Sequence, residues 1–94
     1  MVVGIVRIEL HVPAARSLKD KRHVVRSLKD RIRERAQASV AEVDHQDLWQ
    51  RAGLAVVTVS TDQAHADREL QAVANEIERV QPGLIARTEF EYLT

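Results

Sequence analysis

The first dozen residues alternate between apolar and polar side chains. Every second position is apolar or glycine: Val2, Gly4, Val6, Ile8, Leu10 and Val12. The positions between them include Arg7, Glu9 and His11. A period of two is typical of a β-strand with one buried face. Pro13 interrupts the pattern, which therefore predicts a strand over residues 2–12.

The next segment changes to a helical period. Its apolar positions form one stripe: Leu18, Val25, Leu28, Ile32 and Ala36. Ser17 is a good N-cap residue, and Asp20, three positions later, provides a short variant of the capping box. We therefore expect a helix over residues 18–36, with basic side chains around the apolar stripe.

The middle of the chain contains two further strand patterns. Residues 39–44 alternate over a short stretch, and residues 54–60 are apolar and rich in β-branched side chains. The second composition favours a strand that is buried more evenly on both faces. The connection over residues 45–51 is polar apart from Leu48 and Trp49.

A second helix and a last strand complete the chain. Thr61 or Asp62 can cap the helix, whose apolar stripe is Ala66, Leu70, Val73, Ile77 and Val80. Pro82 and Gly83 end it, and residues 84–92 alternate again.

The resulting order, β-α-β-β-α-β, predicts an α+β, ferredoxin-like fold. Four antiparallel strands form one sheet with both helices on one face. We expect one domain over residues 1–94. The other sheet face then has no cover, and Val3, Ile5 and Ile85 would line part of it. An open apolar face favours a protein partner or a second copy of the chain. The alternative is that these residues are scattered among charged ones and need no partner.

Charge is distributed unevenly along a chain whose formal net charge is zero. Residues 16–35 carry nine basic and three acidic side chains, a balance of +6, whereas residues 36–94 carry four basic and ten acidic ones, a balance of −6. A protein polarised in this way can attract a polyanion to one surface.

Composition excludes several classes of chemistry. The absence of cysteine excludes disulfides, thiolate metal sites and cysteine nucleophiles. The apolar N-terminal residues meet Arg7 and Glu9 early, so we expect neither a signal peptide nor a membrane span, and a cytoplasmic location.

Three local strings together resemble the YlxP-like family of small bacterial proteins. They are Ser-Leu-Lys-Asp-Lys-Arg at residues 17–22, Ala-Glu-Val-Asp at residues 41–44 and Asp-Leu-Trp-Gln-Arg at residues 47–51. The resemblance covers essentially the whole chain and implies a ferredoxin-like fold. It also implies genes that often lie beside those for translation initiation factor two and ribosome-binding factor A, and hence a link to ribosome maturation or translation. It implies no catalytic residue.

The strongest candidate site is the basic face of the first helix. We expect phosphate contacts from six residues: Arg16, Lys19, Arg22, Arg26, Lys29 and Arg33. Lys21, Arg31 and Arg35 would strengthen the positive electrostatic field around this helix. The free N–H groups at the helix start would add attraction for an anion. The alternative is a solvated face whose charges pair with nearby acids or with the acidic second helix.

The mode of RNA binding follows from the scarcity of aromatic residues. The chain has only Trp49, Phe90 and Tyr92, none of them on the first or third strand, and Phe90 is expected to face the core. Base stacking on the sheet, as in RNA-recognition motifs, is therefore not expected. The pattern favours structured RNA or a ribosomal subunit, bound through its backbone.

Trp49 has two interpretations. It is either a partner-binding hot spot or a residue that closes one end of the core, with Asp47 paired to Arg51; we favour the second. A protein-interaction or self-assembling module, using the open sheet face and Trp49, is the alternative function. In that case the basic helix would meet the acidic second helix of the next copy.

No catalytic or metal site is expected. Acylphosphatases, the comparable ferredoxin-like enzymes, use a glycine-bearing phosphate loop and an asparagine, whereas the corresponding loop here, residues 13–16, lacks glycine and Asn75 lies in the second helix. Glu42, Asp44, His45 and Asp47 form one local acid-histidine string, which is weak evidence for a metal. We expect no cofactor.

Overall fold

The computed structural model describes residues 1–94 and contains six regular elements. Their order along the chain is β1 (Val2–His11), α1 (Leu18–Arg35), β2 (Ser39–Asp44), β3 (Arg51–Ser60), α2 (Gln63–Val80) and β4 (Ile85–Leu93). Each predicted element is present. β3 begins three residues earlier than the apolar run because Arg51, Ala52 and Gly53 continue its pairing with β1.

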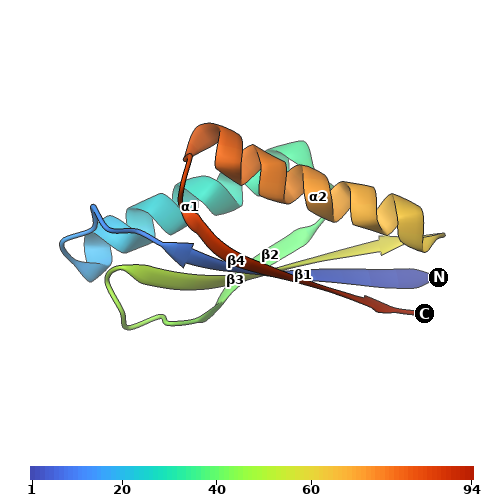
Figure 1. Cartoon of the computed structure of the whole chain (residues 1–94), viewed down its shortest axis with the longest axis horizontal. Coiled ribbons are helices and arrows are strands. Elements are labelled where there is room, and N and C mark those ends of the chain that lie inside the picture. The colour runs from blue at the N-terminus through green and yellow to red at the C-terminus, as the bar shows by residue number, and fades with distance from the viewer.

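The four strands form one antiparallel sheet in the order β2-β3-β1-β4. Both helices cover the same face of this sheet, and the opposite face is open (Figure 1). α1 packs over β2 and β3, whereas α2 packs mainly over β1 and β3. The ferredoxin-like α+β fold is therefore confirmed. Neither helix is long and apolar enough to cross a bilayer.

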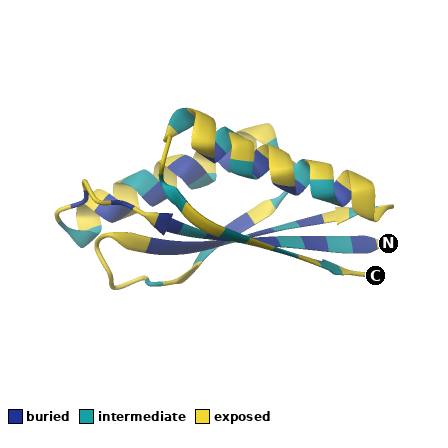
Figure 2. Cartoon of the chain, in the orientation of Figure 1, coloured by how far each residue is buried: buried dark blue, intermediate teal, exposed yellow.

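The core lies between the sheet and the helices, as the burial pattern in Figure 2 shows. Val6, Ile8 and Leu10 of β1 are at most 1% exposed and meet the helix stripes. Gly4 belongs to the same inward face, where a side chain would not fit. A β-carbon there would lie 3.0 Å from Leu70 Cδ1 and 3.2 Å from Ala66 Cβ, so glycine allows α2 to approach the strand closely.

The helix caps agree with the sequence. Ser17 Oγ accepts a hydrogen bond from the Asp20 N–H, and an Asp20 carboxylate oxygen accepts one from the Arg16 N–H. The first bond is the predicted half of a capping box, whereas the returning bond goes to the N–H of Arg16 and not to that of the N-cap residue Ser17. Asp62, one of the two proposed caps of α2, accepts a hydrogen bond from the His65 N–H.

The expected position of Ile85 on the open face is wrong. The pairing of β1 with β4 shifts between Glu9 and Leu10, so that Glu9 lies opposite Arg87 and Leu10 lies opposite Ile85. The extra residue, Ala86, reverses the side-chain alternation at this point. Ile85 consequently faces the helices and packs against the core.

The even burial expected for the third strand is also wrong. The inward side chains of Leu54, Val56 and Thr58 are buried, but Val57 on the other face is only half-buried and Val59 is 64% exposed. The reason is that no helix covers the outer face of β3.

Candidate nucleic-acid interface

The predicted phosphate-binding residues lie together along one flank of α1 and the turn before it. At 100° per residue, Lys19, Arg22, Arg26, Lys29 and Arg33 fall within one arc of the helix surface. All except Lys29, which is half-buried, have exposed side chains, and so has Arg16. We call these six residues the basic stripe: Arg16, Lys19, Arg22, Arg26, Lys29 and Arg33.

The basic stripe is almost free of ion pairs. Only Arg33 has an acidic neighbour, Asp30, at 3.6 Å, and it also donates a hydrogen bond to the Val40 carbonyl oxygen at 3.4 Å. The other five cations have no carboxylate within 4.0 Å. The Val40 contact places this flank of α1 beside β2, an edge strand of the sheet.

The remaining arginines of α1 lie on the opposite flank. Arg31 and Arg35 each approach Glu76 of α2, with nitrogen–oxygen distances of 3.9 Å. Arg79 donates to the same carboxylate at 2.5 Å. Arg79 is the main cause of a lowered Glu76 pKa, with smaller contributions from Arg35 and Arg31. The alternative of charges paired with the second helix therefore holds for Arg31 and Arg35, but not for the basic stripe.

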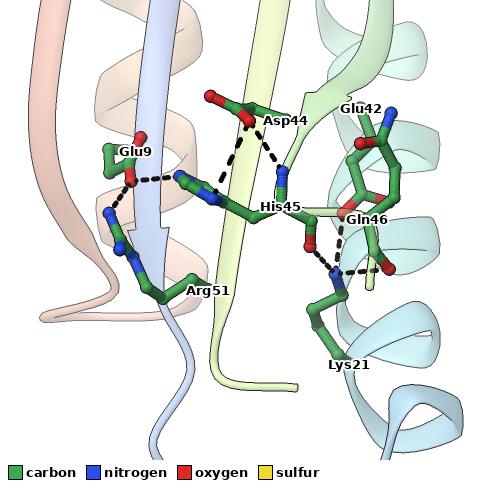
Figure 3. Close-up of polar contacts among 7 residues, drawn as sticks. All are labelled: Glu9, Lys21, Glu42, Asp44, His45, Gln46 and Arg51. Carbon is green, nitrogen blue, oxygen red and sulfur yellow. Dashed lines mark hydrogen bonds and ion pairs between the residues drawn. The ribbon is translucent and has the colours of Figure 1, made fainter. Parts of the chain in front are cut away.

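Lys21 does not contribute to the surface field as expected. Its side chain is 0% exposed, and its ammonium group donates three hydrogen bonds: to Glu42 Oε2 at 3.0 Å, to the His45 carbonyl oxygen at 2.7 Å and to the Gln46 carbonyl oxygen at 3.2 Å (Figure 3). All three ammonium protons are thereby satisfied. Lys21 is a structural residue that fixes the connection between β2 and β3.

The sequence contained a signal for this buried pair. Lys21 continues the apolar stripe at helical spacing between Leu18 and Val25, so a core-facing position was readable. Glu42 lies opposite Leu54 and therefore on the helix-covered face of β2. A carboxylate on that face requires a buried cation as a partner.

The start of α1 is less open to an external anion than expected. The Asp20 carboxylate already accepts the Arg16 N–H at 3.0 Å and occupies the region where the helix dipole would attract a negative charge. Any anion bound at this end must therefore contact the Arg16 and Lys19 side chains.

The acid-histidine string does not converge. Glu42 points to Lys21, whereas the His45 ring lies 2.7 Å from Glu9 Oε1 of β1. Arg51 contacts the same Glu9 oxygen at 2.5 Å (Figure 3), and chiefly this hydrogen bond lowers the Glu9 pKa. No three His, Asp or Glu side chains gather in a way that could hold a metal ion.

The interpretation of Trp49 as a core residue is wrong. Its side chain is 55% exposed, and the adjacent Leu48 is 41% exposed. The expected pair between Asp47 and Arg51 is also absent, because Arg51 instead contacts Glu9. An extended β3 that begins at Arg51 carries this arginine toward β1 and leaves the tryptophan outside the core.

An apolar patch on the open sheet face was only partly predicted. Val3 lies between Val59 and Leu93, and Ile5 lies opposite Val57. Val59 and Leu93 are 64% and 51% exposed. We call these five residues the open-face patch. Its β3 members, Val57 and Val59, are alternate residues of the apolar run over residues 54–60. The sequence would have indicated them if that strand had been expected to have one uncovered face.

Three comparisons relate the chain to known proteins, two of them by sequence and one by fold. Residues 3–90 match a family described as "Protein of unknown function (DUF503)". The chain is 33% identical over 95 residues to "Uncharacterized protein YlxP" of Bacillus subtilis (strain 168), covering 95% of this chain and 99% of that protein. Among solved structures, it is similar to "De novo designed protein Foldit4", with a TM-score of 0.54 and 15% sequence identity over 99% of this chain and 96% of that chain. The last likeness concerns the fold alone.

Proposed function

This chain belongs to the DUF503 family and is similar to YlxP over nearly its whole length. From that premise we propose that it is a cytoplasmic, non-enzymatic protein that binds structured RNA. The basic stripe contacts the phosphate backbone. The ribosome or one of its assembling subunits is the expected source of the RNA, in line with the gene neighbourhood that the family resemblance implies. Ribosome maturation or translation is then the process served.

The observation that carries this proposal is a row of cations of which all but Arg33 lack an acidic partner. From Lys19 to Arg33 the stripe spans about 21 Å at 1.5 Å per residue. Long basic side chains that have no acidic partner retain their full attraction for phosphate, whereas Arg31 and Arg35 are already partly neutralised by Glu76. A rigid helix holds the stripe in one line, which suits the regular backbone of a folded RNA.

The sheet supports a backbone mode of recognition. The outer faces of the central strands β1 and β3 carry Val3, Ile5, Val57 and Val59, none of which is aromatic. Stacking of bases on the sheet is therefore not available. The acidic charge of residues 36–94 would also orient the protein, so that α1 approaches a polyanion first.

The test is co-sedimentation with ribosomal subunits over a salt series, followed by filter binding to purified ribosomal RNA. Arg22→Glu combined with Arg26→Glu should weaken binding strongly while the fold survives, since both side chains are exposed and unpaired. Binding by this variant equal to that of the wild type would refute the stripe as the site.

A matched control separates local contact from general charge. Arg26→Glu and Arg68→Glu each lower the net charge by two, and each replaces an exposed helical arginine that has no ion-pair partner. Only Arg26 lies on the basic stripe, because Arg68 belongs to α2. The proposal requires weaker RNA binding by the first variant and near-normal binding by the second.

A second candidate function, self-association, is favoured by the open-face patch. Two copies that pack these faces together would cover Val59 and Leu93, the most exposed members of the patch. Sedimentation from low to high micromolar concentration tests this. A dimer that Val59→Lys converts to a monomer would support the candidate, and a wild-type monomer at every concentration would contradict it.

A further inference from the structure

Trp49 is an exposed aromatic side chain in a chain that has only three aromatic residues. It is the only tryptophan of the protein and is 55% exposed beside a 41% exposed Leu48. Neither residue belongs to the open-face patch, which lies on the strands toward the chain termini (Figure 1). Their exposure therefore needs a separate explanation.

The connection that carries Trp49 is held firmly at both ends. Before it, Lys21 donates hydrogen bonds to the carbonyl oxygens of His45 and Gln46. After it, the Gln50 amide donates to the Ala15 carbonyl oxygen at 3.3 Å, and the Gln50 carbonyl oxygen accepts from the Val12 N–H at 2.8 Å. A ring on a fixed loop loses little conformational freedom when it meets a ligand, which favours binding.

The surroundings of the ring suit a flat, polar-edged ligand. An open hollow of about 430 Å³ is lined by His11, Asp47, Leu48, Trp49, Gln50 and Arg51. Trp49 and Leu48 offer apolar surface for a π-face. The Asp47 carboxylate offers hydrogen-bond acceptors for a base edge, and so does the Gln50 amide oxygen, since the Gln50 NH2 group already donates to the Pro13 and Ala15 carbonyl oxygens. The Asp47 carboxylate also repels phosphate, and the one arginine of the lining, Arg51, is already paired with Glu9. The hollow therefore favours a base over the backbone.

The hollow lies at the same end of the molecule as the start of the basic stripe. Gln50, which follows Trp49, contacts the carbonyl oxygen of Ala15, and Ala15 is followed directly by Arg16. If an RNA duplex lies along α1, a single-stranded RNA extension that leaves the duplex would pass this end of the protein. Figure 1 shows the β1–α1 turn and the β2–β3 connection together there.

We propose that Trp49 is a stacking platform for an unpaired base next to the RNA helix that the basic stripe binds. This assignment rests on the proposed function and makes it more specific: the preferred RNA is a duplex with a single-stranded extension. Stacking of one base on an aromatic side chain tolerates any base identity. The stripe then supplies most of the attraction, and Trp49 selects a junction between paired and unpaired RNA.

The experiment compares two RNA hairpins that differ only in a short unpaired extension. Because Trp49 is the only tryptophan, intrinsic fluorescence reports directly on its ring. We expect both hairpins to bind, and only the extended one to quench the fluorescence and to bind about tenfold more tightly. Trp49→Ala should remove this gain, measured with labelled RNA, whereas Trp49→Phe should keep most of it. Circular dichroism checks that the variants fold.

The outcomes separate the two proposals. Equal affinity for both hairpins without quenching, or a Trp49→Ala variant that still prefers the extension, would overturn the stacking assignment while leaving the basic stripe in place. Binding of neither hairpin at low salt would overturn both proposals. A Trp49→Ala variant that weakens both hairpins equally would show that the ring does not discriminate unpaired bases, and would also overturn the assignment.

Discussion

Replacement of Lys21 by methionine tests whether the buried ammonium group holds the β2–β3 connection. Methionine keeps an unbranched side chain, one heavy atom shorter than that of lysine, but donates no hydrogen bond. The change leaves the Glu42 carboxylate, whose side chain is only 16% exposed, without its cation. It also removes the donor of the Gln46 carbonyl oxygen, whereas the His45 carbonyl oxygen keeps the Leu48 N–H. The fold should therefore lose stability.

The size of the expected loss in unfolding free energy follows from the burial of Lys21 and Glu42. Loss of one partner from a buried ion pair costs about 3–5 kcal/mol. Water can reach Glu42 and the exposed Gln46 in part, so the lower end, about 3 kcal/mol, is expected. For a domain of this size, that change lowers the melting temperature by more than about 10 °C.

Urea unfolding of four proteins measures the effect: wild type, Lys21→Met, Glu42→Leu and the double variant. We expect Lys21→Met to be less stable than the double variant, because the latter contains no unpaired buried charge. Lys29→Met, a lysine change in the same helix without an ion pair to lose, should stay within about 0.5 kcal/mol of the wild type. A Lys21→Met variant as stable as the wild type would refute the reasoning.

Three further predictions concern pH and packing. Burial, and after it a hydrogen bond to Asp67, raise the pKa of Tyr92 from 10.0 to about 12. The stability that the protonated hydroxyl contributes to the fold is therefore complete below pH 10 and is lost as pH rises toward 12. Tyr92→Phe should remove this alkaline loss of stability, measured by unfolding curves. Chiefly Arg51 lowers the Glu9 pKa below 4.5, so stability should fall as pH drops through that lowered value, and the acid-side slope should be smaller in Glu9→Gln. Gly4→Ala should cost about 1–3 kcal/mol in thermal unfolding, because its new methyl group would meet Leu70 at 3.0 Å.

The fold was predictable because its signals are local and repeated. The alternation of β1, the apolar stripes of both helices and the caps Ser17 and Asp62 each specify an element independently. Few topologies other than the ferredoxin-like one can join six elements in this order through short connections. The basic stripe could be located for the same reason, since helical spacing alone decides which side chains share a flank.

The errors arose where one residue depends on a distant one. The burial of Lys21 requires Glu42, which lies 21 positions away in the sequence. The position of Ile85 depends on a single extra residue in the pairing of β4 with β1. For Trp49 the favoured interpretation is closure of one end of the core, with Asp47 paired to Arg51. It fails because β3 begins at Arg51, which contacts Glu9, and the core is complete without the tryptophan.

The most direct test of the central claim is the salt dependence of RNA binding by the wild type, Arg26→Glu and Arg68→Glu. If the five unpaired cations of the stripe each displace a counterion, the slope of log K against log salt should be about −4 to −5 for the wild type. We predict a slope shallower by about one or more for Arg26→Glu and an unchanged slope for Arg68→Glu. Equal slopes for the two variants, or no binding at low salt, would contradict the assignment of the basic stripe as an RNA-binding surface.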